Sequence, residues 1–156
     1  MSPRERSIDL SDCPSTARKD GPILRLVLGD QLNPNHSWFS QTRHDVVYVM
    51  MEVRSETDYV RHHAQKVLAL FAAMRDFARR LEERGHRVRY LAIDDAANQQ
   101  DLARNLDVLV AKYRATAVEY QEPDEWRVDQ RLLHWTRHCA VPVSLHGSEH
   151  FYTGRT

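Results

Sequence analysis

The stretch ILRLVLGDQL, residues 23–32, decides the fold, because a short apolar run is followed at once by a turn and polar residues. A run of this length that ends at Gly29 is typical of a buried strand in a parallel sheet. Comparable runs predict further strands along the chain, at residues 46–51, 87–93, 115–120 and 141–145.

Helical patterns lie between these predicted strands. The strongest spans residues 56–84, where apolar residues recur at steps of three and four and line one helix face. Ser55 to Asp58 fit a capping box at its start, and Gly85 fits a C-terminal cap. Further helices are predicted at 99–112 and 124–138. Alternating strands and helices predict an α/β fold, an open, mostly parallel, five-stranded Rossmann-like sheet with helices on both faces.

Length and composition describe one globular domain. We expect residues 1–22 to be a disordered leader, because they mix charge, Ser, Pro and Gly without periodicity, and residues 23–156 to form the domain. The 22 basic and 22 acidic residues cancel. Duplex binding normally leaves a basic footprint, so no strong nucleic-acid binding by the chain itself is expected. The arginine-rich run 75–89 is interpreted as a solvated helix face.

The cysteines and the hydropathy of the chain argue against a metal-cluster protein, a membrane protein and a secreted protein. Cys13 and Cys139 lie far apart without a metal-ligand spacing, and two cysteines are too few for a four-cysteine cluster. No apolar run is long enough to cross a membrane, and the N-terminus has no hydrophobic signal core. The prediction is a cytoplasmic protein without membrane contact.

Polar residues at the ends of the predicted strands are the first candidates for a ligand site. In open parallel sheets, ligands bind outside the carboxyl ends of the strands, near the point where strand order reverses. The residues concerned are Gly29-Asp30-Gln31, Glu52, Asp94-Asp95 and Gln121-Glu122. The loop after the first strand matches neither a Walker motif nor GxGxxG, which disfavours phosphate binding. A simple turn and a ligand loop remain equally open there.

The flank of the long predicted helix adds a second set of polar side chains. Glu56, Tyr59 and His63 follow one another at steps of three and four, although spacing alone favours Glu56 as a first-turn acid facing the helix dipole. His62 and His63 are adjacent and point to different faces, so no metal site is predicted. Trp126 is interpreted as a packing residue. No nucleophile signature is present, and no catalytic residue is assigned.

The order of three segments carries a family resemblance. LGDQLNP (28–34), the block from MEVRSETDY to AIDD (51–95) and EPDEWRVDQ (122–130) resemble the N-terminal domain of the photolyase-related proteins. These are the iron–sulfur bacterial cryptochromes and (6-4) photolyases, and the resemblance covers residues 24–151. It implies a sheet of the photolyase N-terminal type. In that family a helical domain follows, which holds FAD and a [4Fe–4S] cluster and contacts the DNA lesion.

The resemblance also implies a ligand. The α/β domain of such proteins holds an antenna chromophore, 6,7-dimethyl-8-ribityllumazine, which passes excitation to the flavin. Carried over by position, its pocket would draw on one set of residues, Gly29, Asp30, Gln31, Leu32, Glu56, Tyr59 and His63. Glu56 is the strongest candidate among them.

The expected role is therefore light harvesting for flavin-dependent DNA repair or blue-light signalling, without catalysis by this chain alone. The chain ends at Thr156, so FAD and [4Fe–4S] are expected only in a C-terminal domain that it lacks. The expected partners are the antenna chromophore and a helical FAD/[4Fe–4S] photolyase domain. Two alternatives stay open, a small-molecule-binding α/β enzyme and a docking module for a separately encoded helical domain.

Overall fold

The structure is a computed structural model that describes residues 20–54 and 64–149. Its strands form one five-stranded sheet in the order β3-β2-β1-β4-β5, and every neighbouring pair is parallel. The strands are β1 (Ile23–Leu26), β2 (Val46–Met51), β3 (Val88–Leu91), β4 (Ala117–Gln121) and β5 (Val143–His146). The helices are α2 (Ala64–Glu83), α3 (Leu102–Tyr113) and α4 (Trp126–Thr136), with the short 3-10 helix η1 at Ser37–Phe39. The predicted parallel α/β sheet is confirmed.

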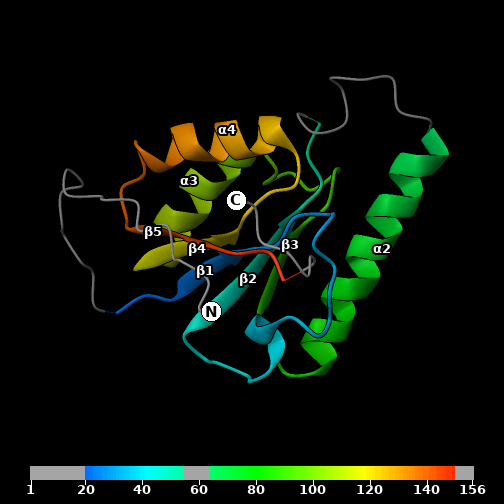
Figure 1. Cartoon of the computed structure of the whole chain (residues 1–156), viewed down its shortest axis with the longest axis horizontal. Helices are drawn as coiled ribbons and strands as arrows, with labels where there is room; N and C mark the ends of the chain where they lie inside the picture. Colours follow the sequence, from blue (N-terminus) through cyan, green and yellow to red (C-terminus); the bar gives the residue numbers. More distant parts are fainter. Residues whose placement is uncertain (1–19, 55–63, 150–156) are drawn as a thin grey trace.

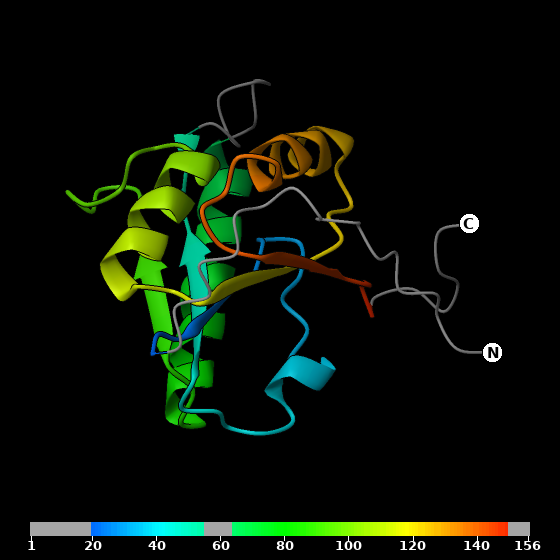
Figure 2. The same cartoon turned by 90° about the vertical axis from the view of Figure 1, so that its left-hand side faces the viewer.

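Helices cover both faces of the sheet. Figure 1 shows α3 and α4 together on one side and α2 on the other, and the turned view in Figure 2 agrees. The chain steps from β1 to β2 to β3 in one direction, then returns past β1 to β4 and β5. Right-handed crossovers place the two series of connections on opposite faces. The strand order therefore reverses between β1 and β4, and the ligand crevice of such sheets lies at this switch point.

Alternate strand residues feed two separate cores. Leu24 and Leu26 of β1 belong to the cluster beneath α3 and α4, together with Leu106 and Leu132. Tyr48 and Met50 of β2 face the other way and pack with a cluster from α2, whose members are Met74, Phe77, Ala78 and Leu81. Burial on both faces explains why β2 reads as an uninterrupted apolar run.

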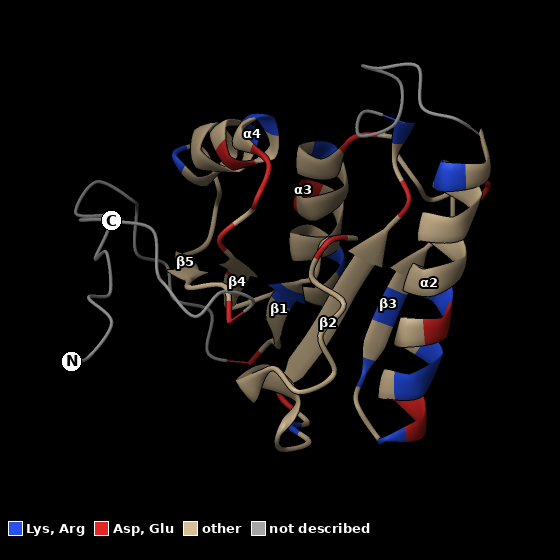
Figure 3. Cartoon of the chain, turned by 45° about the vertical axis from the view of Figure 1, so that its right-hand side comes forward, with Lys and Arg blue, Asp and Glu red and all other residues tan. Residues whose placement is uncertain are grey.

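Charge gathers on the outside of α2, whereas the strands are mostly uncharged (Figure 3). Arg79 pairs with Asp76 at 2.7 Å and with Glu83 one turn further on, and Arg80 pairs with Asp76 at 2.8 Å. These side chains are exposed, so each pair contributes little to stability. For this part of α2, the interpretation as a solvated helix face is confirmed.

Capping residues determine where two of the helices end or begin, and one of these caps was predicted from the sequence. Gly85 has φ +88° and its N–H bonds to Glu82 O, while His86 N–H reaches back to Leu81 O at 3.0 Å, so Gly85 ends α2 as predicted. The next helix begins later than predicted, because the Asp101 side chain caps it by accepting from Arg104 N–H at 3.0 Å. The cap decides the start, and the residues before Asp101 form a turn.

The segment before β1 contacts the sheet. Thr116 N–H donates to Pro22 O at 3.0 Å, so Pro22, which lies within the predicted leader, is held beside β4. The first 19 residues of that leader lie outside the described residues. None of the described helices is apolar and long enough to cross a membrane.

Candidate functional site

Gly29 lets the loop after β1 pack closely on α2. A Cβ atom at this position would lie 3.1 Å from Leu70 Cδ1 and 3.2 Å from Met74 Sδ, closer than ordinary van der Waals contact. Gly29 does not have a positive φ, so close approach is what requires glycine here. The loop therefore packs directly against α2 at Leu70 and Met74, at the carboxyl edge of the sheet.

Gln31 bridges the switch point. Its side chain is buried, and Oε1 accepts from Leu28 N–H at 3.2 Å. Its Nε2 donates to Gln121 O at 3.4 Å and to Glu122 O at 3.3 Å, and so reaches across from the end of β1 to the end of β4. Because both ends of the amide are used within the protein, Gln31 ties the two strand ends together, whereas Asp30 beside it is exposed.

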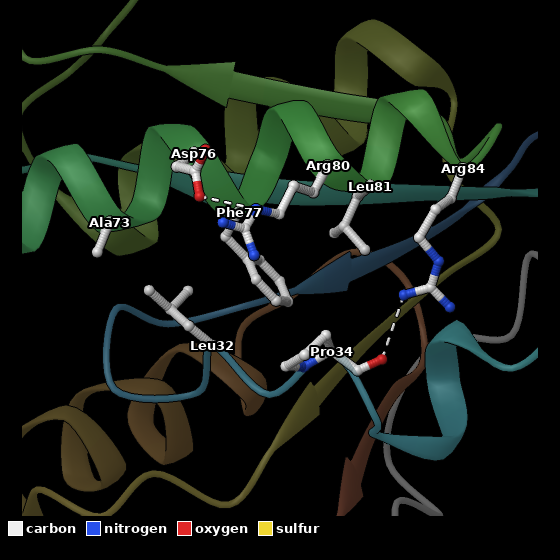
Figure 4. Close-up of a pocket in the computed structure, with 8 residues that line it drawn as sticks. All are labelled: Leu32, Pro34, Ala73, Asp76, Phe77, Arg80, Leu81 and Arg84. Atoms are coloured by element: carbon white, nitrogen blue, oxygen red, sulfur yellow. Dashed lines mark hydrogen bonds and ion pairs between the residues drawn. The ribbon is translucent and has the colours of Figure 1, made fainter.

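Leu32 faces a different part of α2. It lines a hollow of about 220 Å³ between the loop and the helix, shown in Figure 4, with Pro34, Ala73, Asp76, Phe77, Arg80, Leu81 and Arg84. Arg84 Nη1 donates to Pro34 O at 3.2 Å across it. Ala73 lies about 14 Å along the helix axis from Ala64, at the usual rise per residue. The hollow is smaller than ligand pockets, which typically hold about 300–1,000 Å³.

Glu52, the residue after β2, is the centre of a buried polar cluster. Its carboxylate is fully buried and pairs with Arg75 through Nε at 2.6 Å and Nη2 at 2.8 Å. Tyr90 O–H donates to Oε1 at 2.6 Å and Ile93 N–H to Oε2 at 2.8 Å. Asn98 Nδ2 donates to the Glu52 carbonyl at 2.6 Å. This Glu52 cluster joins β2, α2 and the end of β3.

The cluster keeps Glu52 ionised in spite of its burial. Burial alone would raise the pKa of the carboxyl, but the bonds from Arg75, Tyr90 and Ile93 outweigh it, so the pKa of Glu52 is below its usual range. Burial and the neighbouring carboxylate raise the pKa of Tyr90, which therefore stays a hydrogen donor. The hydrogen bond from Arg75 to Glu52 raises the pKa of that guanidinium. All three pKa shifts favour an ionised Glu52 that accepts hydrogen bonds from a charged Arg75 and a neutral Tyr90.

Acid should weaken the fold through Glu52. Because its folded pKa is lowered, its stabilising contribution is complete above the unfolded value of about 4.3 and is lost as pH falls through the folded pKa. We expect the difference in unfolding free energy between wild type and Glu52→Gln to be largest near neutrality and to shrink below about pH 4. Urea melts of both proteins across this range measure it. The other carboxylates titrate in both proteins, so their contributions cancel in the difference. A difference that stayed constant with pH would contradict the role of Glu52.

Gln121 is a second polar side chain at the switch point. It ends β4, its side chain is fully buried, and neither its Oε1 nor its Nε2 has a hydrogen-bond partner among residues 20–54 and 64–149. Its neighbour in β5 is His146. Buried amides are nearly always paired in proteins. Gln121 is therefore a buried polar group whose hydrogen-bonding capacity the described residues leave unused. In the sequence, its signal was a polar residue at the end of a strand.

Trp126 is exposed at the start of α4, with 71% of its surface accessible. The interpretation of Trp126 as a packing residue is wrong, because α4 begins at Trp126 itself and not at Asp124, which turns this first residue outwards. The N-cap residue Glu125 makes no side-chain cap bond. Exposed tryptophans are enriched at binding hot spots.

The remaining predicted residues divide into two groups. Asp95 accepts from Ala97 N–H at 2.8 Å and pairs with Arg89 at 3.2 Å, so it serves a turn. Glu56, Tyr59 and His63 lie outside the described residues, between the end of β2 and Ala64, where α2 begins. Within residues 20–54 and 64–149, no group of three or more His, Cys, Asp or Glu side chains could hold a metal ion.

Comparisons with known proteins place the chain in a family. A profile of the family described as deoxyribodipyrimidine photo-lyase-related protein matches residues 25–156. A (6-4) photolyase of Agrobacterium fabrum (strain C58 / ATCC 33970) is 33% identical over 130 residues, which is 82% of this chain and 25% of the relative. The match thus spans a quarter of that relative's length. Because the family profile covers more than half of the chain, the chain belongs to the deoxyribodipyrimidine photo-lyase-related protein family.

Proposed function

We propose that this domain binds an antenna chromophore, 6,7-dimethyl-8-ribityllumazine, at the carboxyl edge of its sheet, and serves photolyase- or cryptochrome-type chemistry. When bound, such a chromophore absorbs light and passes the excitation to a flavin. Family membership supports the proposal, since a (6-4) photolyase is among the relatives. DNA repair or blue-light signalling would require a flavin domain as well as this one. That role is part of the proposal and is likewise supported by family membership.

The observation that carries the proposal is the packing of Gly29 against Leu70 and Met74. It brings the exposed Asp30 beside the N-terminal half of α2, the helix that follows Glu56, Tyr59 and His63 in the sequence. In this arrangement Asp30 and those three residues contact the chromophore. Gly29, Gln31 and Leu32 shape the loop instead, since Gln31 is used internally and Leu32 lines the hollow that extends from Ala73 toward the C-terminal end of α2.

The available polar groups suit a lumazine. Its ring is flat, with carbonyl and N–H groups along one edge, and its ribityl tail carries hydroxyls. A site for it needs apolar walls and a few fixed donors and acceptors. Carboxylates at positions 30 and 56 would accept from hydroxyls of the ribityl tail.

The wild-type chain should bind the lumazine by itself. We expect saturable binding with one ligand per chain, because every residue assigned to the site belongs to this domain. A fluorescence titration with 6,7-dimethyl-8-ribityllumazine measures it, and riboflavin, which has the same ribityl tail on a larger ring, serves as the comparison ligand. An absence of saturable lumazine binding to the folded chain would contradict the proposal.

One observation favours a second role, the docking of a helical photolyase domain. Trp126 presents a large apolar surface at the carboxyl edge, beside the polar residues of the β4–α4 corner. Aromatic side chains surrounded by polar ones are typical anchors of protein interfaces. The two roles are compatible, since a docked flavin domain would receive the excitation.

A further inference from the structure

We propose that His134 and His138 form a chelating site for a divalent transition-metal ion at the C-terminal end of α4. Both side chains are exposed, and their ring centroids lie 4.9 Å apart with the planes at 45°. Histidines four positions apart are a recurrent pair of zinc ligands on helices, and here the second one lies in the turn that directly follows α4. The site is independent of the chromophore proposal. The pair was not predicted from the sequence, in which His62 and His63 were the histidines considered as metal ligands.

The ring separation fits a shared ion. An ion bonded at about 2.1 Å to one nitrogen of each ring, with roughly 90–110° between the bonds, holds the ring centroids about 4.6–5.3 Å apart. The observed 4.9 Å lies inside that interval. The rings therefore already have the separation that chelation requires.

Hydrogen bonding determines which nitrogen of His138 is the ligand. Nδ1 of His138 lies 3.0 Å from the carbonyl oxygen of His134. A carbonyl oxygen only accepts, so Nδ1 carries the proton, and the lone pair of the neutral ring is on Nε2. A bond from the non-ligating nitrogen to a backbone carbonyl is the usual support of a metal-bound imidazole. His138 follows the last residue of α4 by two positions, so the ion would also fasten the turn after the helix.

The donor set selects the class of ion. Imidazole nitrogens suit Cu²⁺, Ni²⁺ and Zn²⁺, whereas Mg²⁺ and Ca²⁺ prefer oxygen ligands. Affinity should follow the general order for nitrogen sites, with Cu²⁺ above Ni²⁺ and Zn²⁺. In the described part of the chain no cluster of three or more ligating side chains includes this pair, so water would complete the coordination shell.

Calorimetric titration of the untagged chain with CuCl₂ and ZnCl₂ tests the site. We expect Cu²⁺ affinity to fall at least about tenfold in His134→Ala and in His138→Ala, since loss even of a residue that only supports a ligand costs that much. His44→Ala, at an exposed histidine before β2, is the matched control and should bind as wild type does. Equal affinity in wild type and both variants overturns the proposal.

A melting experiment separates ligation from a structural role. Zn²⁺ should raise the Tm of wild type and leave that of His134→Ala unchanged, because an ion that binds only the folded state stabilises it. Without metal, His134→Ala should melt as wild type does, since the side chain is exposed. His134→Gln keeps a polar surface without an imidazole and should behave like His134→Ala. An equal rise of Tm with Zn²⁺ in these variants also overturns the proposal.

Discussion

Replacing Glu52 with alanine should lower the free energy of unfolding by about 2–4 kcal/mol. The variant removes the acceptor of Tyr90 and of the Ile93 N–H, and it breaks the pair with Arg75. Removing one partner of a fully buried ion pair costs about 3–5 kcal/mol. The Arg75 side chain is 53% exposed and regains water, so the expected cost is smaller than for a pair in which both partners are buried.

Urea melts at neutral pH measure the effect, and the chain offers a matched control. Glu83 also pairs with an arginine of α2, but both partners are exposed. Glu83→Ala should therefore change the free energy of unfolding by less than about 0.5 kcal/mol. If Glu52→Ala and Glu83→Ala proved equally stable, the buried cluster would contribute no more than a surface pair.

The second large effect concerns Glu56. Glu56→Ala should weaken binding of 6,7-dimethyl-8-ribityllumazine by roughly ten- to a hundredfold, because a hydrogen bond to a charged group is worth about 1.5–3 kcal/mol. The fold should be little affected, since the sequence predicts Glu56 in the first turn of a helix, and an acid in such a position contributes only about 0.3–1 kcal/mol. This prediction rests on the proposed chromophore site.

Fluorescence titration of wild type and variant measures the change, with circular dichroism melts as the control of folding. Glu82→Ala provides a matched variant, because Glu82 is an exposed acid near the far end of α2. If wild type binds and Glu56→Ala binds equally well, the assignment of Glu56 is wrong while chromophore binding stands. If wild type does not bind, the proposed function itself fails.

Strands whose pattern is set by burial could be predicted from the sequence. The predicted strand at 46–51 matches β2, because burial on both faces leaves only apolar residues there. The strand predicted at 87–93 was too long, since Ala92 and Ile93 already belong to the turn that bonds Glu52 and Asn98. The short helix η1 was missed, because Trp38 and Phe39 gain their helical turn from packing against β2 and α2.

The location of the candidate site could be predicted from the sequence, but the interactions of its residues could not. Strand-end polar residues indicated the carboxyl edge, and Glu52 and Gln121 are indeed there. Their roles depend on partners distant in the sequence, such as Arg75 for Glu52 and the carbonyl of Gln121 for Gln31, which no local pattern reveals. The exposure of Trp126 likewise depends on where α4 begins. The sequence predicted a start at Asp124, whereas the helix begins two residues later, at Trp126.

The central position of β1 has a consequence for how the chain folds. β1 is the first strand in the sequence, yet it pairs on one side with β4, and Arg25 meets Glu119 across 94 residues. Pairings of such sequence separation form slowly, because a long loop must close first. During synthesis β1, β2 and β3 can assemble with α2 while one edge of β1 still lacks its partner. An unpaired strand edge is a template for pairing with another chain, so that edge is open to mispairing between nascent chains until β4 arrives.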